Sequence, residues 1–480
     1  MNAHENRLFI GGRWTEPSGR RTITVTSAGT GELLGAVPEA TTADVDHAVR
    51  AARTAFDTPG GWPSWEPERR AAAMVRLADE LDARSEATAS TVSAQNGMPI
   101  SFSRAFEGSV PAALLRYYAA LVSAAPRAEF RSGLPRGTTE VRREPVGVVA
   151  AVMSWNFPQT LAFFKLAPAL AAGCTVVLKP APETVLDSVL LAEAVAAAGL
   201  PAGVVGIVPA GREIGAYLVA HPGVDKVAFT GSTASGRRVA AACAALLRPV
   251  TLELGGKSAA VVLDDADLGA DAGERFTTSF LNNGQTCFAS TRILAPRSRY
   301  DEVVAVYTAM ARDARVGDAL DPATQIGPLV SSRQRERVEG YIGRGLADGA
   351  RLTAGGGRPP GLDRGWFVEP TVFADVDNSS VIAQEEIFGP VLTVTPYEDE
   401  DDAVRLANDS VYGLAGSVWT TDLERGARVA RRIRTGTIGL NGYLPDITSP
   451  YGGVKGSGLG RELGPEGLAA YQQLQSVYHP

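Results

Sequence analysis

The sequence is poor in cysteine and histidine, with three cysteines and four histidines among 480 residues. So odd and sparse a set of cysteines excludes a disulfide framework and favours a reducing compartment, and we expect the protein in the cytoplasm. No Cys-x-x-Cys or His-x-x-x-His spacing occurs. The sequence therefore predicts no metal site.

Long apolar runs and an excess of positive charge are also missing. The longest apolar stretch, residues 166–178, contains Pro168 and Gly173 and is too short to cross a bilayer, and the N-terminus has no apolar signal segment. Lys and Arg number 46 against 53 Asp and Glu, which gives a net charge of −7 and no basic surface. We expect no nucleic-acid or membrane partner, and a small molecule as the ligand.

The composition is that of a folded protein, with 45% hydrophobic and 21% charged residues, and the length predicts two to four domains. Strand-like runs alternate with Ala-rich helical stretches between residues 145 and 254. Strands are expected at 146–154, 175–180, 203–210 and 225–232, and helices at 161–173, 185–198, 212–220 and 236–247. This pattern predicts a doubly wound, nucleotide-binding α/β domain.

A second α/β domain is expected from Gly255 onward, with strands at 258–263, 292–296, 371–376 and 391–397. Two segments, 127–144 and 461–480, are polar and strand-like, and we expect them to form an arm that pairs with a neighbouring subunit. A surface hairpin is the alternative. The predicted division is 1–126 and 145–254 for the cofactor domain, 255–460 for the catalytic domain, and the two remaining segments for the arm.

Cys287 is the cysteine that could act as a nucleophile. It lies among small and polar residues at 284–290, where a thiolate would be accessible. Cys174 and Cys243 are surrounded by apolar residues, which is typical of buried, inert thiols.

Glu253 ends an apolar strand within residues 250–258, and burial there would raise its pKa toward the range of a general base. A solvated strand-end acid is the alternative. The pair Gly255 and Gly256 follows directly. Because neither residue has a Cβ atom, another group could approach the backbone closely.

Two further features could hold an anionic ligand. Residues 231–236 (GSTASG) follow a strand and open a helix, so their backbone N–H groups could receive a phosphate. Packing between strand and helix is the alternative. Lys179 ends a strand at the edge where open α/β sheets bind ligands, although a solvated lysine would look the same in the sequence.

Taken together, the chain resembles the aldehyde dehydrogenase superfamily over nearly its full length. Eight motifs occur in the family's order. They are SWNFP (154–158), VVLKPAPE (176–183), VAFTGST (227–233), LELGGKS (252–258), NNGQTC (282–287), EEIFGPV (385–391), NDSVYGLA (408–415) and PYGGVKGSGLGRELG (450–464). The separation of Glu253 and Cys287, 34 residues, is also similar to that of the family.

The resemblance implies a Rossmann-like cofactor domain, an α/β catalytic domain and a β-strand oligomerisation arm in a homodimer or homotetramer. It implies oxidation of an aldehyde to its carboxylic acid through a thiohemiacetal and a thioester, with hydride transfer to NAD or NADP. Cys287 would be the nucleophile, Glu253 the base that activates water, and Asn156 an oxyanion donor together with the backbone N–H of Cys287. The residues implied in cofactor binding are Trp155, Lys179, Gly211, Gly215, Gly231, Ser232, Leu254, Glu386 and Phe388.

The sequence departs from the family pattern at two positions. Ser154 stands where many members have proline, and we expect little consequence. Pro182 stands where NAD-preferring members often carry a glutamate for the ribose hydroxyls, and Glu183 comes one residue late. We therefore expect NAD to be the cofactor, with NADP also accepted.

The pocket residues implied by the resemblance are Phe157, Leu161, Phe164, Phe288 and Tyr451. They carry no charge to pair with a substrate carboxylate, so a neutral aliphatic, aromatic or terpenoid aldehyde is expected. Residues 443–449 could add polarity instead. Two other functions compete, namely transfer of the acyl group to coenzyme A, which would not need Glu253, and a non-enzymatic role on the same fold.

Overall fold

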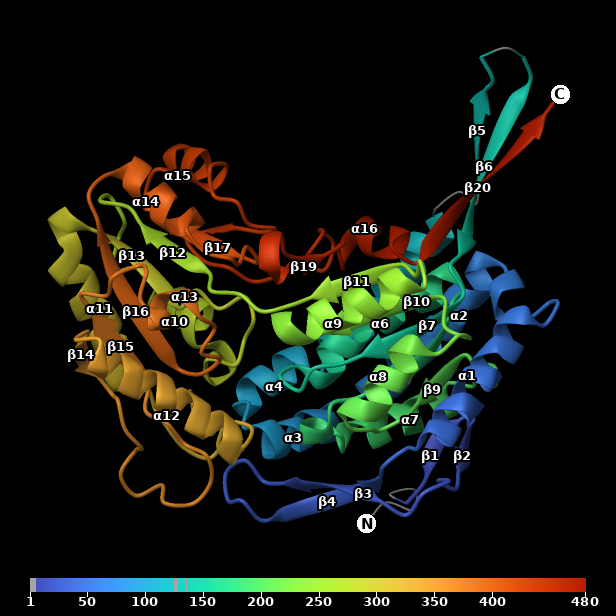
Figure 1. Ribbon diagram of the computed structural model, residues 1–480, viewed down its shortest axis with the longest axis horizontal. Coiled ribbons are helices and arrows are strands. Elements are labelled where there is room, and N and C mark those ends of the chain that lie inside the picture. Colours follow the sequence, from blue (N-terminus) through green and yellow to red (C-terminus); the bar gives the residue numbers. More distant parts are fainter. Residues whose placement is uncertain (1–5, 125–127, 135) are drawn as a thin grey trace.

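The computed structural model describes residues 6–124, 128–134 and 136–480. Residues 1–5 and 125–126 of the predicted cofactor domain, and 127 and 135 of the predicted arm, lie outside this part of the chain. Figure 1 shows two α/β lobes side by side, with a narrow three-stranded arm that projects from one of them.

The first lobe is built on an eight-stranded sheet in the order β19-β11-β10-β7-β8-β9-β1-β2. The strands are β1 Leu8–Ile10, β2 Arg13–Thr15, β7 Val148–Val152, β8 Thr175–Lys179, β9 Val205–Ile207, β10 Lys226–Thr230, β11 Val250–Glu253 and β19 Gly458–Leu459. Strands β7 to β11 are parallel and follow the spatial order 5-4-1-2-3, with the order reversing between β7 and β10. The predicted doubly wound α/β arrangement is confirmed.

Alternation along each central strand explains why helices cover both faces of this sheet. In β7, Val149 and Ala151 belong to one apolar cluster, whereas Val148 and Ala150 belong to another. The first cluster packs against α6 and α7, and the second against α1, α8 and α9. A strand covered on both sides has no polar face, which is why these strands read as continuous apolar runs.

The helices of this lobe lie close to the predicted ranges. They are α1 Thr42–Asp57, α2 Pro67–Asp82, α3 Ser85–Asn96, α4 Ile100–Phe106, α5 Val110–Ala124, α6 Pro158–Ala172, α7 Asp187–Ala197, α8 Arg212–Ala220 and α9 Thr233–Ala245. Helix α8 has the predicted bounds, whereas α9 begins three residues early because Ser232 caps it by accepting a hydrogen bond from the backbone N–H of Ser235. Every residue of α6 is buried, and this helix packs against α2 and α5.

The second lobe contains a seven-stranded sheet in the order β14-β15-β16-β13-β12-β17-β18. The strands are β12 Ala259–Val262, β13 Arg292–Pro296, β14 Arg351–Ala354, β15 Thr371–Ala374, β16 Val391–Tyr397, β17 Gly416–Trp419 and β18 Gly439–Leu440. The helices are α10 Ala272–Phe280, α11 Tyr300–Asp313, α12 Ser332–Ala347, α13 Val381–Gln384, α14 Glu400–Asn408 and α15 Leu423–Ala430. All neighbouring strands are parallel except β14 and β15.

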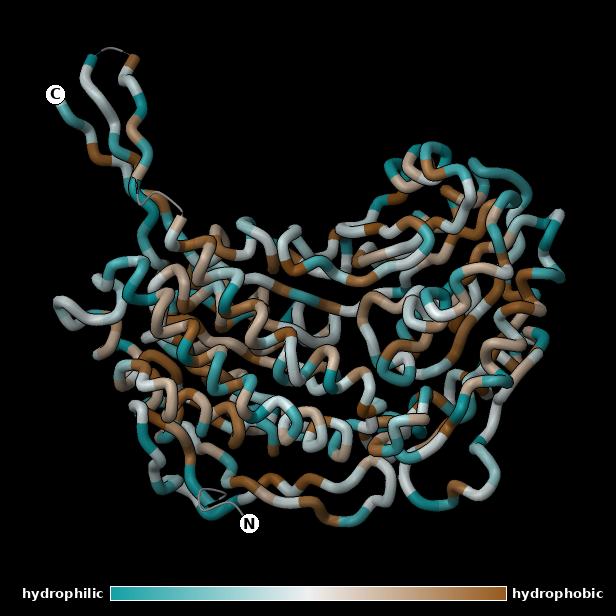
Figure 2. Tube along the Cα trace, turned by 180° about the vertical axis from the view of Figure 1, so that it is seen from behind, coloured by the Kyte–Doolittle hydropathy of each residue, from teal (hydrophilic) through white to brown (hydrophobic). Residues whose placement is uncertain are grey.

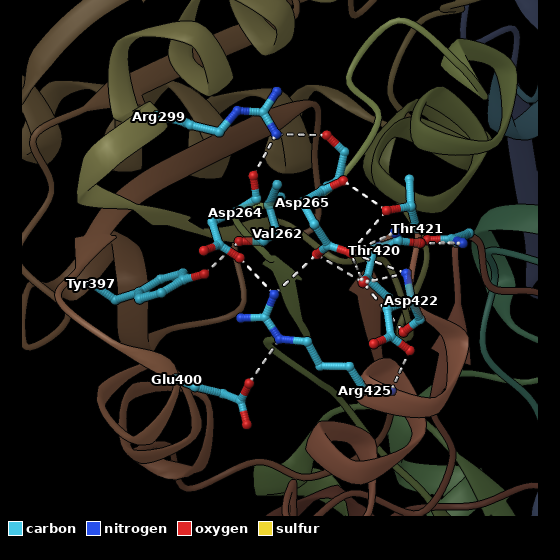
Figure 3. A network of polar contacts seen from close by, with 12 residues as sticks. Val262, Asp264, Asp265, Arg299, Tyr397, Glu400, Thr420, Thr421, Asp422 and Arg425 are labelled. Atoms are coloured by element: carbon cyan, nitrogen blue, oxygen red, sulfur yellow. Dashed lines mark hydrogen bonds and ion pairs between the residues drawn. The ribbon is translucent and has the colours of Figure 1, made fainter.

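A polar network ties the ends of β12 and β17 together (Figure 3). The carboxylate of Asp265 accepts hydrogen bonds from the hydroxyls of Thr420 and Thr421 and from the backbone N–H groups of Thr421 and Asp422. The guanidinium of Arg425 bridges Asp265 to further acids. Burial acts to raise the pKa of Asp265, but these hydrogen bonds outweigh it and lower the pKa.

The arm is a sheet in the order β20-β6-β5, formed by β5 Ala128–Ser132, β6 Thr138–Pro145 and β20 Gln472–His479. All pairings are antiparallel. Apolar side chains are exposed on it, notably Phe130, Leu474 and Tyr478. Figure 2 shows brown apolar stretches at the arm among teal polar ones.

The strand-like interpretation of the whole tail, 461–480, is wrong for its first half. Residues Gly464–Ala469 form helix α16, which packs against α6 and buries Leu468, and Tyr471 behind it is also buried. Leu463 is buried as well, so this segment has the core contacts that its polar composition did not reveal. A separate hairpin, β3 Thr22–Thr26 and β4 Leu33–Pro38, lies along the edge of the molecule in Figure 1.

Candidate active site

A cleft of about 720 Å³ opens in the first lobe where the strand order reverses. Its walls come from the segments that follow β7, β8 and β10, the position at which open α/β sheets bind ligands. Described residues in this lining include Ser154, Trp155, Lys179, Pro182, Glu183, Arg212, Gly215, Gly231, Ser232, Ser235, Arg238 and Arg333.

Lys179 projects from the end of β8 into this lining. Its side chain is buried, and its ammonium donates to the carbonyl oxygen of Pro180 at 3.0 Å. Burial lowers the pKa of Lys179 to about 8, while the charges of Glu183 and Glu39 act to raise it. A Cβ atom at Gly215 would lie 3.3 Å from the lysine Cδ, so glycine leaves the side chain its space. The ammonium has donors left for a ribose or phosphate oxygen.

The N-terminus of α9 also opens on the cleft, through Gly231, Ser232 and Ser235. The helix has 13 residues, and its first backbone N–H groups carry the positive end of the helix dipole. A buried ammonium and a helix N-terminus on one cleft fit the pyrophosphate and ribose of a dinucleotide. The residues present therefore fit NAD.

Four residues implied in cofactor binding are absent from the described lining of the cleft, namely Gly211, Leu254, Glu386 and Phe388. The first two make contacts within the first lobe and with residue 457. The backbone N–H of Gly211 donates to the carboxylate of Glu39 at 3.2 Å. Leu254 is buried, and its N–H donates to the carbonyl of Ser457 at 2.9 Å. Both residues contribute to the scaffold, and their contact with a cofactor stays a prediction.

The two consecutive glycines after Glu253 are explained by what packs on them. A Cβ atom on Gly255 would overlap the carboxylate of Glu386, and one on Gly256 would lie 2.5 Å from the carbonyl oxygen of Cys287. The N–H of Gly256 donates to Glu386 at 3.0 Å. Burial raises the pKa of Glu386 to about 7, against the charges of Arg337 and Lys257. The close approach expected from the sequence thus links Glu386 with the cysteine loop.

Phe388 lies two residues beyond Glu386 and contacts Trp155. Their rings are 5.2 Å apart and nearly perpendicular, and Phe388 has a φ of +66°. A left-handed backbone is costly for an aromatic residue, so it marks a position that the surroundings hold in place. The contact joins the cleft, which Trp155 lines, to the segment that carries Glu386.

The loop before Cys287 is strained and held by amide side chains. Asn282, Asn283 and Gly284 have φ values of +51°, +61° and +72°. Asn283 donates to the carbonyls of Gly97 and Pro328, and its own side-chain carbonyl accepts from Gly327. These asparagines were not among the predicted site residues. Their tolerance of left-handed φ was the available signal.

Asn156 is buried directly below this loop. Its Nδ2 donates to the carbonyl of Gln285 at 3.1 Å, and its Oδ1 accepts from the hydroxyl of Ser154 at 2.7 Å. The expectation that Ser154 has little consequence therefore misses a contact, since proline could not make this hydrogen bond. The side chains of Asn96 and Asn282 donate to the backbone carbonyl of Asn156, which fixes its main chain.

Glu253 ends β11 and is 3% exposed. Among the described residues none donates a hydrogen bond to either carboxylate oxygen. Burial raises the pKa of Glu253 well above its ordinary value, as does the charge of Glu462, whereas Lys165 and Arg461 act to lower it. Lys165 and Glu462 form a buried ion pair of 2.7 Å. A carboxylate without partners can accept a proton from water at this position.

Cys287 is the one cysteine of the three whose side chain is partly exposed. The surrounding apolar side chains keep bulk water from the sulfur, and this burial raises the pKa of the thiol to about 12. The hydrogen bond to Tyr451 lowers this pKa, and the charges of Glu386 and Glu253 raise it. The negative charges of both carboxylates therefore disfavour the thiolate form of Cys287.

The five side chains of the implied pocket are all buried. The ring of Tyr451 packs at 5.9 Å from Phe164 and at 6.5 Å from Phe288. Tyr443 was not among the predicted pocket residues. Its ring centroid lies 5.3 Å from that of Phe288, and its hydroxyl forms a hydrogen bond of 2.6 Å with the hydroxyl of Thr437. Residues 443–449 thus add an aromatic side chain whose hydroxyl is already engaged.

Pro182 lies in the cleft lining and starts a short 3₁₀ turn, Pro182–Thr184. Glu183 lines the cleft beside it and accepts a hydrogen bond from Arg333 at 3.4 Å. Arg212 and Arg238 line the same cleft. The cleft therefore carries three guanidinium groups, of which that of Arg333 bonds to Glu183.

Neither a metal centre nor a membrane span is found in the described part of the chain. No three His, Cys, Asp or Glu side chains of residues 6–124, 128–134 and 136–480 come together as metal ligands. No helix within those ranges has the length and apolarity to cross a bilayer.

Comparison with known proteins matches residues 14–477 to the model of the aldehyde dehydrogenase family. Geranial dehydrogenase of Castellaniella defragrans is 54% identical over 478 residues, covering 100% of this chain and 99% of the relative. The crystal structure of a Mycobacterium tuberculosis aldehyde dehydrogenase complexed with NAD+ is 51% identical, with a TM-score of 0.97 over 99% of this chain and 98% of that one. A mutant of aldehyde dehydrogenase C from Pseudomonas syringae, complexed with NAD+ and octanal, is 39% identical, with a TM-score of 0.95 over 99% and 97% of the two chains.

Proposed function

The chain belongs to the aldehyde dehydrogenase family, and from that membership we propose how its own residues carry out the reaction. It is an NAD-dependent enzyme that oxidises aldehydes to carboxylic acids. The proposal rests on one observation above all, that the segment 451–452 contacts both the Cys287 sulfur and the carboxylate of Glu253, which has no hydrogen-bond partner among the described residues. A nucleophile and a free base in one pocket support covalent catalysis.

In the proposed mechanism, the Cys287 thiol releases its proton to solvent, and the thiolate Sγ attacks the aldehyde carbon to form a thiohemiacetal. The carbonyl oxygen becomes negatively charged, and it needs donors already in place. Asn156 Nδ2 has one N–H engaged with Gln285 and a second available, and the backbone N–H of Cys287 is the other donor. NAD, when bound, supplies the acceptor for the hydride that leaves the former aldehyde carbon.

The acyl group is then a thioester on Cys287, and Glu253 removes a proton from the water that hydrolyses it. The raised pKa of this carboxyl makes it a stronger base than an exposed glutamate. Transfer to coenzyme A is the alternative. A turnover that depends stoichiometrically on coenzyme A would favour it.

Lys179 and the N-terminus of α9 would hold the ribose and pyrophosphate, with Glu386 and the Trp155–Phe388 pair at the reacting end. We assign the first lobe to the cofactor together with Asn156 and Glu253, which follow β7 and end β11, and the second lobe to Cys287. Strand β19, at residues 458–459 of the predicted catalytic domain, joins the first sheet.

The substrate is proposed to be a neutral, apolar aldehyde of the aliphatic, aromatic or terpenoid class. Phe157, Leu161, Phe164 and Phe288 are buried around the nucleophile, and none carries a charge. Geranial, in the name of one relative, and octanal, bound to another, are aldehydes of this kind.

We also propose that the chain forms a homodimer or homotetramer through the arm and works in the cytoplasm. The exposed apolar side chains of β5 and β20 and the free edges of their sheet support the first proposal. Three free cysteines support the second.

Two experiments test this proposal. Purified protein would be assayed on a panel of aldehydes with each nicotinamide cofactor by following the reduced cofactor, and apolar aldehydes should have the highest kcat/KM. In the Cys287→Ala variant, oxidation of every aldehyde should be abolished while NAD binding is kept. Comparable turnover in this variant would remove Cys287 from the mechanism.

A further inference from the structure

Besides lining the pocket, Tyr451 contacts the nucleophile itself. The hydroxyl oxygen of Tyr451 lies 3.4 Å from Cys287 Sγ, within hydrogen-bond distance for sulfur. Tyr451 is 3% exposed. Phe164 and Phe288 pack edge-on against its ring and fix its direction.

The main chain of Tyr451 is fixed as firmly as its ring. Tyr451 and Glu462 exchange two backbone hydrogen bonds of 2.7 Å, and the side chain of Glu462 pairs with the buried Lys165. The neighbouring Gly452 packs against the carboxylate of Glu253. One short segment therefore touches both the nucleophile and the proposed base.

We propose that Tyr451 is a catalytic residue that donates its O–H to the Cys287 thiolate. This inference rests on the proposed role of Cys287 as the nucleophile. In the neutral thiol either atom can be the donor, but a thiolate can only accept, so the bond strengthens when the sulfur loses its proton.

The groups around the sulfur make such a donor necessary. Burial opposes the negative charge on sulfur, and the carboxylates of Glu386 and Glu253 oppose it further. Tyr443 also packs against Phe288, and its hydroxyl is engaged with Thr437 rather than with the sulfur. The pKa of Tyr451 is raised well above its ordinary value, chiefly by burial, so its proton remains available for donation.

The size of the effect follows from two opposing terms. A hydrogen bond to the charged form of a group changes the pKa of that group by about 1 to 2. Its loss would lower the thiolate fraction about ten- to hundredfold, while the more basic sulfur would become about three- to tenfold more nucleophilic. We expect a net loss of about three- to tenfold in the rate of attack at a fixed pH.

Alkylation of the thiol tests the proposal without cofactor or aldehyde. At pH 8, iodoacetamide forms an S–C bond and releases iodide, and the thiol proton goes to solvent. Cys287→Ala gives the background from the other two cysteines. The rate at Cys287 should be about three- to tenfold lower in Tyr451→Phe and unchanged in the control Tyr307→Phe, which alters a buried tyrosine in the core of the second lobe.

An equal rate in Tyr451→Phe and the native protein would overturn the proposal, as would an equal loss in both tyrosine variants. Replacement of Tyr451 by difluorotyrosine keeps the ring and the hydroxyl of the side chain. This variant serves as the test if Tyr451→Phe fails to fold. As the stronger donor it should raise the rate, and an unchanged rate counts against the proposal. Failure here leaves Cys287 as the nucleophile, whereas turnover by Cys287→Ala would refute the proposed function itself.

Discussion

The hydroxyl of Ser154 donates a hydrogen bond of 2.7 Å to the side-chain carbonyl of Asn156. This bond decides which way the amide faces, because it fixes the carbonyl oxygen toward Ser154 and turns the NH₂ group toward the cysteine loop, where it donates to Gln285 at 3.1 Å. The remaining N–H is then available to an oxyanion.

In Ser154→Ala the Asn156 amide loses this partner and can adopt the flipped orientation. One hydrogen bond contributes about 1 kcal/mol, so we expect kcat/KM to fall about fivefold while the dissociation constant of NAD is unchanged. Ser154→Thr keeps a hydroxyl and should retain most of the activity. A kcat/KM in Ser154→Ala equal to that of the native protein would show that the amide is fixed by other contacts.

In Glu253→Gln, hydrolysis of the thioester should become rate-limiting, because the amide cannot take a proton from water. Stopped-flow traces should show a burst of reduced cofactor and then turnover slowed about 10²- to 10⁴-fold. Because the pKa of Glu253 is raised, native turnover should fall as the pH drops and this carboxylate becomes protonated, a dependence that the variant should lose. Unimpaired steady-state hydrolysis would exclude Glu253 as the essential base.

Pro182→Glu should sharpen the preference for NAD. A carboxylate there would accept hydrogen bonds from the ribose hydroxyls and repel the extra phosphate of NADP, which Lys179 and the arginines of the cleft otherwise attract. We expect the ratio of kcat/KM for the two cofactors to rise about ten- to hundredfold, with Pro182→Ala as the control. Absolute NAD selectivity in the native protein, unchanged by the substitution, would mean that another residue reads the ribose.

Deletion of residues 127–144 should yield monomers or aggregates. A milder test is the pair Leu474→Asp and Tyr478→Asp, which charges one exposed face of β20. Sedimentation velocity should then show smaller particles, whereas Gln475→Asp, on the opposite face of the strand, serves as the control. An unchanged oligomer size in the deletion variant would refute the role of the arm.

Asp265→Asn should lower the free energy of unfolding by about 1 to 3 kcal/mol, since the carboxylate accepts several hydrogen bonds. The folded-state pKa of Asp265 is lowered, so this stability is present above the ordinary carboxyl pKa and is lost as the pH falls through the folded value. Tm values should therefore differ most at neutral pH and converge in acid. Asp264→Asn, which removes an exposed ion pair, should have a smaller effect.

The sequence predicted those elements of the fold whose apolar pattern is visible along the element itself. Strands β7, β8 and β10 are buried on both faces, so their apolar runs are unambiguous. Helix α16 was missed because its burial depends on α6, far away in the chain. Its residues satisfy no local pattern of their own.

The same limit applies to the site. Cys287, Glu253 and Asn156 stood out through their motifs, but the contacts that hold them did not. The side chain of Gln285 donates a hydrogen bond to the carbonyl of Asn96, which is 189 positions away in the sequence. Tyr451 contacts Cys287 although 164 positions separate them. Such pairings are created by the packing of two lobes, and no spacing in the sequence records them.

The pairing of β20 with β6 has a consequence for biosynthesis. Strand β20 is translated some three hundred positions after its partner β6. Until β20 has been synthesised, the β5–β6 ribbon is a two-stranded hairpin, which is a marginally stable state. A nascent chain therefore lacks a complete arm until its last described strand has been made, and it cannot yet join a partner through that arm.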